Sequence, residues 1–266
     1  MVELLSYSFM QIALIGGVII GFLSGLFSPY LVLRRLSLIG DGIAHLAFGG
    51  VALGFLLGFS PLGTALGIAI IGALGMRYMI RHQIYGEAAI AIILSLGVGL
   101  AVVIIGATKG FGVNLFSYLI GSILTLSWTE IMVLTGTALL ITLFFVLYRR
   151  ELFLLTFQPD IARMQSSRSQ IADIGFTIAI AFVTIMSVQA VGILLVSALL
   201  VVPGLIALRL SGSFKQTVLI SVAVGISANI MGIIGSYYAD IPPSGFIVLL
   251  LVFVYLLTFI MKRGSS

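Results

Sequence analysis

The chain has 266 residues, of which 61% are hydrophobic and 8% are charged, and its formal net charge is +5. Soluble domains carry about 25% charged residues, so this composition excludes a soluble globule and requires lipid around a helical bundle. The chain has no cysteine and two histidines, which excludes disulfides, iron–sulfur clusters and thiolate zinc sites and disfavours a structural zinc site.

Nine apolar segments approach the length of about 20 residues that a helix needs to cross a bilayer. In chain order they cover 9–33, 39–58, 62–80, 87–107, 128–148, 171–189, 191–208, 216–236 and 243–261. The first contains Ser28 and Pro29, where we expect a kink or a break. The segment 113–126 is too short to span and is expected to be re-entrant or interfacial. We predict an all-α integral membrane protein with one transmembrane domain over 1–266.

The distribution of basic residues predicts the orientation and explains the positive charge without nucleic acid. With nine spans and the N-terminus outside, all but one of the lysines and arginines fall on one side. They are Arg34, Arg35, Arg77, Arg81, Arg149, Arg150, Arg163, Arg168, Arg209, Lys215, Lys262 and Arg263. Lys109 falls on the other side. The positive-inside rule makes the basic side cytoplasmic, and it therefore places the C-terminus in the cytoplasm. If the sixth and seventh segments formed one span, the basic residues after them would fall on the opposite side and the asymmetry would be lost.

Glycines recur at four-residue spacing in the first three segments. The rows are Gly17, Gly21 and Gly25; Gly50, Gly54 and Gly58; and Gly63 and Gly67. In lipid such rows allow two helix backbones to approach closely, and a glycine-lined translocation path is the alternative. Ser127 and Glu130 have the spacing of a capping box that opens the fifth span.

Asp41 and His45 are the strongest candidate metal ligands. Their i, i+4 spacing places a carboxylate and an imidazole on one face of the second span. Oxygen and imidazole nitrogen together suit a borderline divalent ion such as zinc or manganese, with further ligands from other helices or water. The alternative is structural: Asp41 caps the positive end of the helix, and His45 bonds a carbonyl group.

Four other polar residues lie in or beside the spans. Glu87 opens the fourth span and is a possible further metal ligand, although the helix dipole alone also explains it. Asp173, near the start of the sixth span, is interpreted only through the dipole. Asn229 lies within the eighth span, where it lines a cavity or bonds a neighbouring helix. Asp240 lies in an outer loop, where it contacts an arriving cation or only solvent.

The longest cytoplasmic loop covers about 149–170 and contains a predicted short helix near 158–164. Pro159 suits the first helical position, and Asp160 suits the first turn. Such a helix is either an interfacial element or a docking site for a soluble partner. The sequence contains no G-x-x-x-x-G-K-[ST] and no H-E-x-x-H, so any coupling to ATP requires another chain.

The run LRRLSLIGDGIAHLAFGGVALG (33–54) resembles the signature of membrane permeases from zinc and manganese ATP-binding-cassette importers. Four further runs resemble family segments in the expected order: SYLIGSILTLS (117–127), LLTFQPDIARM (154–164), QAVGILLVSALLVVPGLIALRL (189–210) and YYADIPPSGFIVLL (237–250). The opening VELLSYSFM and LGFSP (57–61) are most similar to zinc-uptake permeases of the adhesin-competence type.

The resemblance implies a helical fold related to vitamin B12-type importers. It also implies a permease homodimer, two cytoplasmic ATP-binding subunits and an extracytoplasmic metal-binding protein. Asp41 and His45 fall on the family's D-x-x-x-H motif, which implies a transient metal site. Glu87 falls where the family often has an acid. The coupling region then includes Pro159, Asp160, Ala162 and Arg163, although Gln158 stands where an acid is common and serines 166 and 167 replace an expected glycine.

We therefore expect the permease subunit of an ATP-driven importer in a bacterial cell membrane, with zinc as the cargo and manganese or iron as the alternative. It has no permanently bound cofactor and is not itself an enzyme. A self-contained secondary transporter is a second hypothesis, but such carriers need ionisable relays deep in the spans, whereas most acids here lie near helix ends. An intramembrane enzyme is a third, and no nucleophile and base pair supports it.

Overall fold

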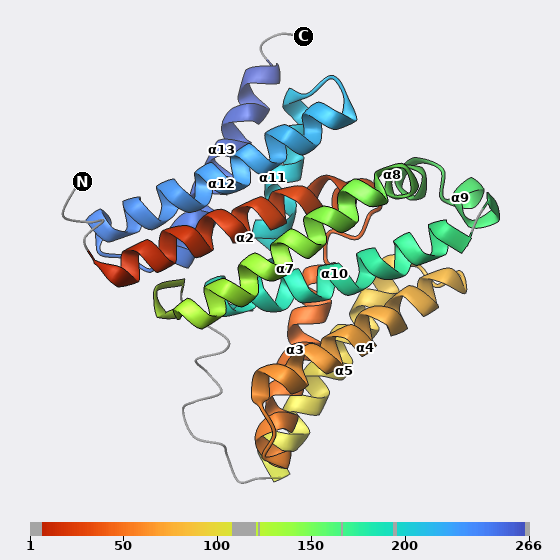
Figure 1. Ribbon diagram of the computed structural model, residues 1–266, viewed down its shortest axis with the longest axis horizontal. Helices are drawn as coiled ribbons and strands as arrows, with labels where there is room; N and C mark the ends of the chain where they lie inside the picture. The colour runs from red at the N-terminus through yellow and green to blue at the C-terminus, as the bar shows by residue number, and fades with distance from the viewer. Residues whose placement is uncertain (1–6, 108–120, 122, 166, 194–195, 264–266) are drawn as a thin grey trace. The chain divides into compact units, whose positions relative to one another are not determined.

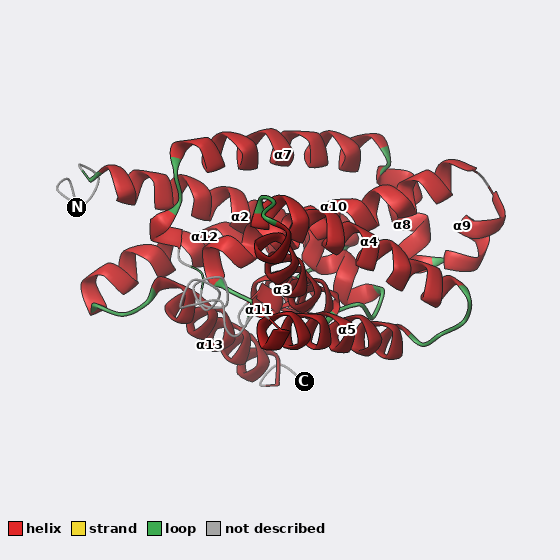
Figure 2. Cartoon of the chain, turned by 90° about the horizontal axis from the view of Figure 1, so that it is seen from below, coloured by secondary structure: helices red, strands yellow, loops and turns green. Residues whose placement is uncertain are grey.

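The computed structural model describes residues 7–107, 121, 123–165, 167–193 and 196–263, and the side chains of 163–165 and 261–263 are outside this description. All regular elements of these residues are helices (Figure 2). In chain order they are α2 (Ser8–Leu33), α3 (Ile39–Leu57), α4 (Pro61–Arg81), α5 (Gly86–Ala107), η1 (Ile123–Thr125), α7 (Trp128–Leu147), α8 (Arg149–Phe157), α9 (Pro159–Gln165), α10 (Ser167–Val191), α11 (Val196–Leu210), α12 (Phe214–Ala239) and α13 (Pro243–Arg263). The all-α prediction is confirmed.

Each of the nine predicted spans corresponds to one helix among the described residues. Eight of these helices are long and apolar enough to cross a membrane, whereas α11 has only 15 residues. The predicted seventh span began at 191, but α10 continues to Val191 and ends at Gly192, which has a φ of 87°. Glycine adopts this left-handed conformation readily, so the chain turns there and α11 starts later. Most of the predicted 113–126 segment, and Lys109, lie outside the described residues.

The chain divides into two compact units, which we describe separately. The α3–α5 unit comprises Leu33–Leu119 and Thr137–Ile185. Within it, α3 packs against both α4 and α5 (Figure 1). A Cβ atom at Gly50 would lie 2.8 Å from the Cα of Ala65, so the glycine row of α3 permits close packing on α4. Gly67, in contrast, has open space around it, so the glycine row of α4 does not pack against another described helix of this unit.

The α11–α13 unit comprises Met1–Val32, Ile120–Gly136 and Met186–Ser266. Helices α11, α12 and α13 pack against one another, and α2 packs along α12. A Cβ atom at Gly21 would lie 2.7 Å from the carbonyl carbon of Gly225, and one at Gly25 would lie 2.6 Å from the backbone oxygen of Ser221. The packing interpretation of this glycine row is confirmed, because only glycine lets these two backbones approach so closely.

The predicted break at Ser28 and Pro29 is not found, since α2 continues through Pro29, and the alternative, a kink, stays a prediction. Ser28 is fully buried, and its Oγ accepts a 2.7 Å hydrogen bond from the Gly204 N–H and donates one of 2.9 Å to the Val201 carbonyl. These bonds satisfy a buried hydroxyl and tie α2 to α11 where Pro203 interrupts the α11 ladder.

The capping box that opens α7 is confirmed. The Ser127 N–H donates to Glu130 Oε2 at 2.7 Å, and the Glu130 N–H donates to Ser127 Oγ at 3.3 Å. Glu130 Oε1 also accepts a 3.3 Å bond from Gln189 Nε2. These contacts satisfy N–H groups that a helix start leaves without partners.

Candidate metal site and coupling segment

Asp41 and His45 lie one turn apart on α3, as the spacing predicted. The helix begins after Leu38, whose side chain provides no capping bond. Asp41 lies in the first turn, where the positive end of the helix dipole stabilises its negative charge. Both side chains are half-buried. The local sequence thus fixes a carboxylate and an imidazole on one helix face.

The structural interpretation of this pair included a hydrogen bond from His45 to a carbonyl group, which the described residues do not form, whereas the favourable position of Asp41 in the first turn remains. Within the part of the chain that the structure describes, neither Asp41 nor His45 has a side-chain hydrogen bond or ion pair. Half-buried polar groups in a membrane protein need partners. Both groups therefore keep their lone pairs available for a ligand.

The backbone at His45 lies directly against α5. A Cβ atom at Gly97 would lie 2.5 Å from the His45 carbonyl oxygen, and one at Gly49 would lie 2.8 Å from the Gly97 carbonyl oxygen. Gly42 faces Ile90 one turn earlier along the same contact. The glycines therefore set how closely α5 approaches the helix that carries the candidate ligands.

Replacing Gly97 with valine is expected to destabilise the protein by about 1–3 kcal/mol and to displace α3 at His45, because the added side chain overlaps backbone that cannot move aside. The thermal midpoint of the purified protein measures the effect. Gly99→Val is the matched control, because Gly99 lies on the same helix with open space around it. Equal midpoints for both variants would show that the contact is not tight.

The possible further ligand Glu87 does not complete a metal-binding group with this pair in the described residues. Glu87 lies in the first turn of α5 and is exposed. Among the described residues, no group of three or more histidine, cysteine, aspartate and glutamate side chains could hold a metal ion. A complete cage is thus not assembled from the described part of one chain, and a metal role for Glu87 stays a prediction.

Asn229 and Asp240 both belong to the α11–α13 unit. Asn229 is fully buried against the glycine row of α2, and its Nδ2 donates a 2.8 Å bond to Gly225 of its own helix. Asp240 ends α12 with a φ of 54° and is exposed. It lines a cavity of about 760 Å³ together with Tyr237 and Pro242. A role in the ion path stays a prediction for both residues.

The predicted short helix in the long loop is confirmed as α9. Pro159 is its first residue, and Asp160 lies in its first turn. Ala162 is fully buried, whereas Pro159 and Asp160 are exposed. Arg163 belongs to the same helix, but its side chain is outside the described part. Helix α8 directly precedes α9 and packs against it.

The interpretation of Asp173 through the helix dipole alone was wrong. Helix α10 begins at Ser167, so Asp173 lies well inside it. Its Oδ1 lies 3.4 Å from Arg34 Nη1, and its Oδ2 accepts a 2.7 Å bond from Arg77 Nε. The signal was available in the sequence, because an acid in an apolar segment needs a cation and the expected cytoplasmic side is rich in arginine.

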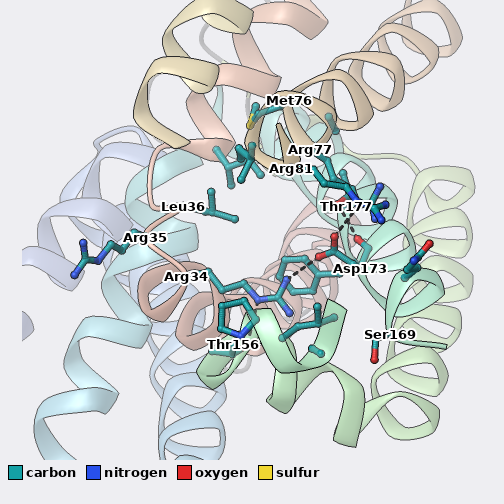
Figure 3. Close-up of a pocket in the computed structure, with 18 of the residues that line it drawn as sticks. Arg34, Arg35, Leu36, Met76, Arg77, Arg81, Thr156, Ser169, Asp173 and Thr177 are labelled. Carbon is teal, nitrogen blue, oxygen red and sulfur yellow. Dashed lines mark hydrogen bonds and ion pairs between the residues drawn. The ribbon is translucent and has the colours of Figure 1, made fainter. Parts of the chain in front are cut away.

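Arg34 also connects its ion-pair partner Asp173 to helix α8. Its Nε donates to Thr156 Oγ1 at 3.1 Å, its Nη2 donates to the Leu152 carbonyl at 3.3 Å, and its guanidinium lies 4.5 Å from the centre of the Phe176 ring. A cavity of about 300 Å³ opens beside this network (Figure 3). The network therefore joins the loop before α3, helix α4, helix α8 and helix α10 within one unit.

Comparison with known proteins gives the same family across almost the whole chain. The pattern of the ABC 3 transport family matches residues 6–262. The manganese transport system membrane protein MntC of Halalkalibacterium halodurans is 31% identical, over 97% of this chain and 88% of the relative.

Two solved structures resemble the fold. PsaBC from Streptococcus pneumoniae in complex with Fab has a chain with 27% identity and a TM-score of 0.83, covering 96% of this chain and 92% of that one. A metal-chelate type ABC transporter in an inward-facing conformation has 15% identity and a TM-score of 0.70, covering 95% and 86%. The second likeness concerns the fold alone.

Proposed function

The chain belongs to the ABC 3 transport family, and on this premise we propose that it forms the ion pathway of an ATP-driven importer for a divalent transition metal. The observation that carries the proposal is the pair Asp41 and His45, one turn apart on α3 and without protein partners in the described residues. A carboxylate and an imidazole together replace part of the hydration shell of such an ion.

Zinc and manganese both suit this donor pair. Manganese is favoured by relatives that are named manganese transport proteins, and zinc is favoured by the resemblance of the opening segment to zinc-uptake permeases. A transport site must release its ion, so an incomplete site with two protein ligands and water fits passage better than a closed cage. The absence of cysteine removes the thiolate that would hold zinc most firmly.

Several chains cooperate in the proposed cycle. A metal-binding protein outside the bacterial cell membrane delivers the ion, and two copies of the permease enclose the path. Cytoplasmic ATP-binding subunits contact α9 around Pro159 and Asp160, which are exposed. Helix α9 packs on α8, which Arg34 joins to α10, so movement of α9 reaches the helices of the α3–α5 unit.

Uptake of radiolabelled zinc and of radiolabelled manganese tests this function. Metal-starved cells express the chain with its cognate binding protein and ATPase, and each ion is offered with and without an excess of the other. We expect one ion to be taken up despite an excess of the other, and only with an active ATPase. Uptake that persists with an inactive ATPase would instead support a secondary transporter.

A further inference from the structure

The cavity beside Asp173 lies entirely within the α3–α5 unit and is rich in arginine. Arg34, Arg35, Arg77 and Arg81 line it, while Asp173 is the one acid among its described lining residues. Arg34 and Arg77 share the carboxylate of Asp173, and Figure 3 shows it between them. One carboxylate offsets one guanidinium, so the lining carries an excess of positive charge.

Arg77 is the residue that points to a ligand. A guanidinium has five N–H donors, and within the described part of the chain Arg77 uses only its Nε–H, at 2.7 Å from Asp173 Oδ2. Both terminal NH₂ groups lack an acceptor in the described residues, although the side chain is only 17% exposed. The bond at Nε fixes the plane of the guanidinium. The edge formed by the two terminal NH₂ groups is therefore available to a bidentate acceptor.

Arg81 and Ser169 supply further donors at the same cavity. Arg81 lies one turn after Arg77 on α4, so both side chains extend from one face of that helix. Arg81 has no hydrogen bond or ion pair in the described part of the chain. Ser169 is 4% exposed, and its hydroxyl is likewise without a protein partner there. A tetrahedral oxyanion meets these demands, because it offers several acceptor oxygens to two guanidinium groups.

The remainder of the lining is apolar and suits an amphiphile. Leu36, Ile39, Met76, Ile80 and Leu155 contribute aliphatic surface to the same cavity. A volume of about 300 Å³ is at the lower end of the range for small-molecule sites, and it accommodates a phosphate with its adjoining glycerol. The proposed orientation puts these arginines at the cytoplasmic leaflet, where anionic lipids concentrate.

We propose that this cavity binds a phosphate group through Arg77 and Arg81, and that the phosphate belongs to an anionic phospholipid of the inner leaflet. Neither Asp41 nor His45 is among the residues that line this cavity. It makes the stability of the α3–α5 unit depend on the surrounding lipid, because a ligand that binds only the folded state stabilises it.

Native mass spectrometry of the purified complex with its ATPase tests the proposal without any metal. The complex is offered phosphatidylglycerol or phosphatidylcholine in equal amounts. We expect preferential retention of phosphatidylglycerol, reduced about tenfold or more by Arg81→Gln, as the loss of one charge-assisted contact predicts. Arg150→Gln is the matched control, because Arg150 is an exposed arginine of the same unit outside the cavity. It should retain the lipid as the unchanged protein does.

Inorganic phosphate distinguishes the source of the phosphate group. If phosphate raises the thermal midpoint of the unchanged complex but not of Arg81→Gln, while lipid retention is equal, the ligand is a free phosphate-bearing anion. Equal lipid retention by Arg81→Gln and Arg150→Gln, with no effect of phosphate, would overturn the site. The lipid preference of the unchanged complex can be measured without any variant. If the unchanged complex retains both lipids equally and phosphate has no effect on it, the proposed site is also overturned.

Discussion

Metal uptake is expected to fall about a hundredfold or more when Asp41→Asn and His45→Ala are combined. Losing a group that only orients a metal ligand costs about 10–100-fold in affinity or activity, and here both proposed ligands are removed. In the described residues neither side chain makes a hydrogen bond or an ion pair that the substitutions would break. The variant should therefore still assemble with its ATPase. The initial rate of uptake at equal amounts of assembled complex measures the effect.

His82→Ala is the matched control for this experiment. His82 is the other histidine of the chain, it is exposed at the end of α4, and its Nδ1 lies 2.9 Å from the Tyr78 carbonyl oxygen. We expect its replacement to leave uptake unchanged. Normal transport by the Asp41 and His45 double variant would instead mean that Asp41 only favours the helix dipole and that His45 is only packed.

Asp173→Asn is expected to destabilise the protein by about 2–3 kcal/mol. Removing one member of a buried ion pair costs about 3–5 kcal/mol because the other charge stays buried, and the 30% exposure of Asp173 lowers this cost. Two arginines lose their carboxylate in this case, and the Arg34 side chain is only 9% exposed. Chemical or thermal unfolding of the purified protein measures the loss, and uptake should fall with it because α8 is held through Arg34.

Glu151→Gln provides the comparison for Asp173→Asn. Glu151 Oε1 lies 3.0 Å from Arg168 Nε, but that arginine is 61% exposed, so the pair contributes less than about 1 kcal/mol. Both substitutions exchange one carboxylate for an amide within the same unit. If the two variants are equally stable, then the position of Asp173 between two arginines is not what stabilises this part of the unit.

Local sequence patterns predicted the positions of most helices. They predicted few of the contacts between helices. Span positions follow from segment length and hydropathy, and α9 and the capping box at Ser127 follow from residues that are close in sequence. The interactions of Asp173 depend on Arg34 and Arg77, which are far away in the chain. In lipid both faces of a helix are apolar, so periodicity does not reveal which face is buried. The contact of Gly97 with His45 could therefore not be predicted from the sequence.

The candidate site likewise combines features that local sequence predicts with features that depend on distant contacts. The i, i+4 spacing of Asp41 and His45 predicted that they share a face of α3, because helix geometry is local. Whether their polar atoms had partners depended on the packing of distant helices. Likewise the four arginines of the cavity were predicted to share one side of the membrane, but only the fold showed that the terminal NH₂ groups of Arg77 have no acceptor among the described residues.

The glycine contact between α2 and α12 has a thermodynamic consequence. Gly21 and Gly225 meet backbone to backbone, so no side chain loses rotamer freedom at this point of the contact. Lipid tails are as apolar as the helices, so close packing and dispersion favour the association rather than the release of water. Hydrophobic association in water weakens on cooling, but this contact lacks that hydration component. The cohesion of the α2 and α12 pair should consequently persist at low temperature.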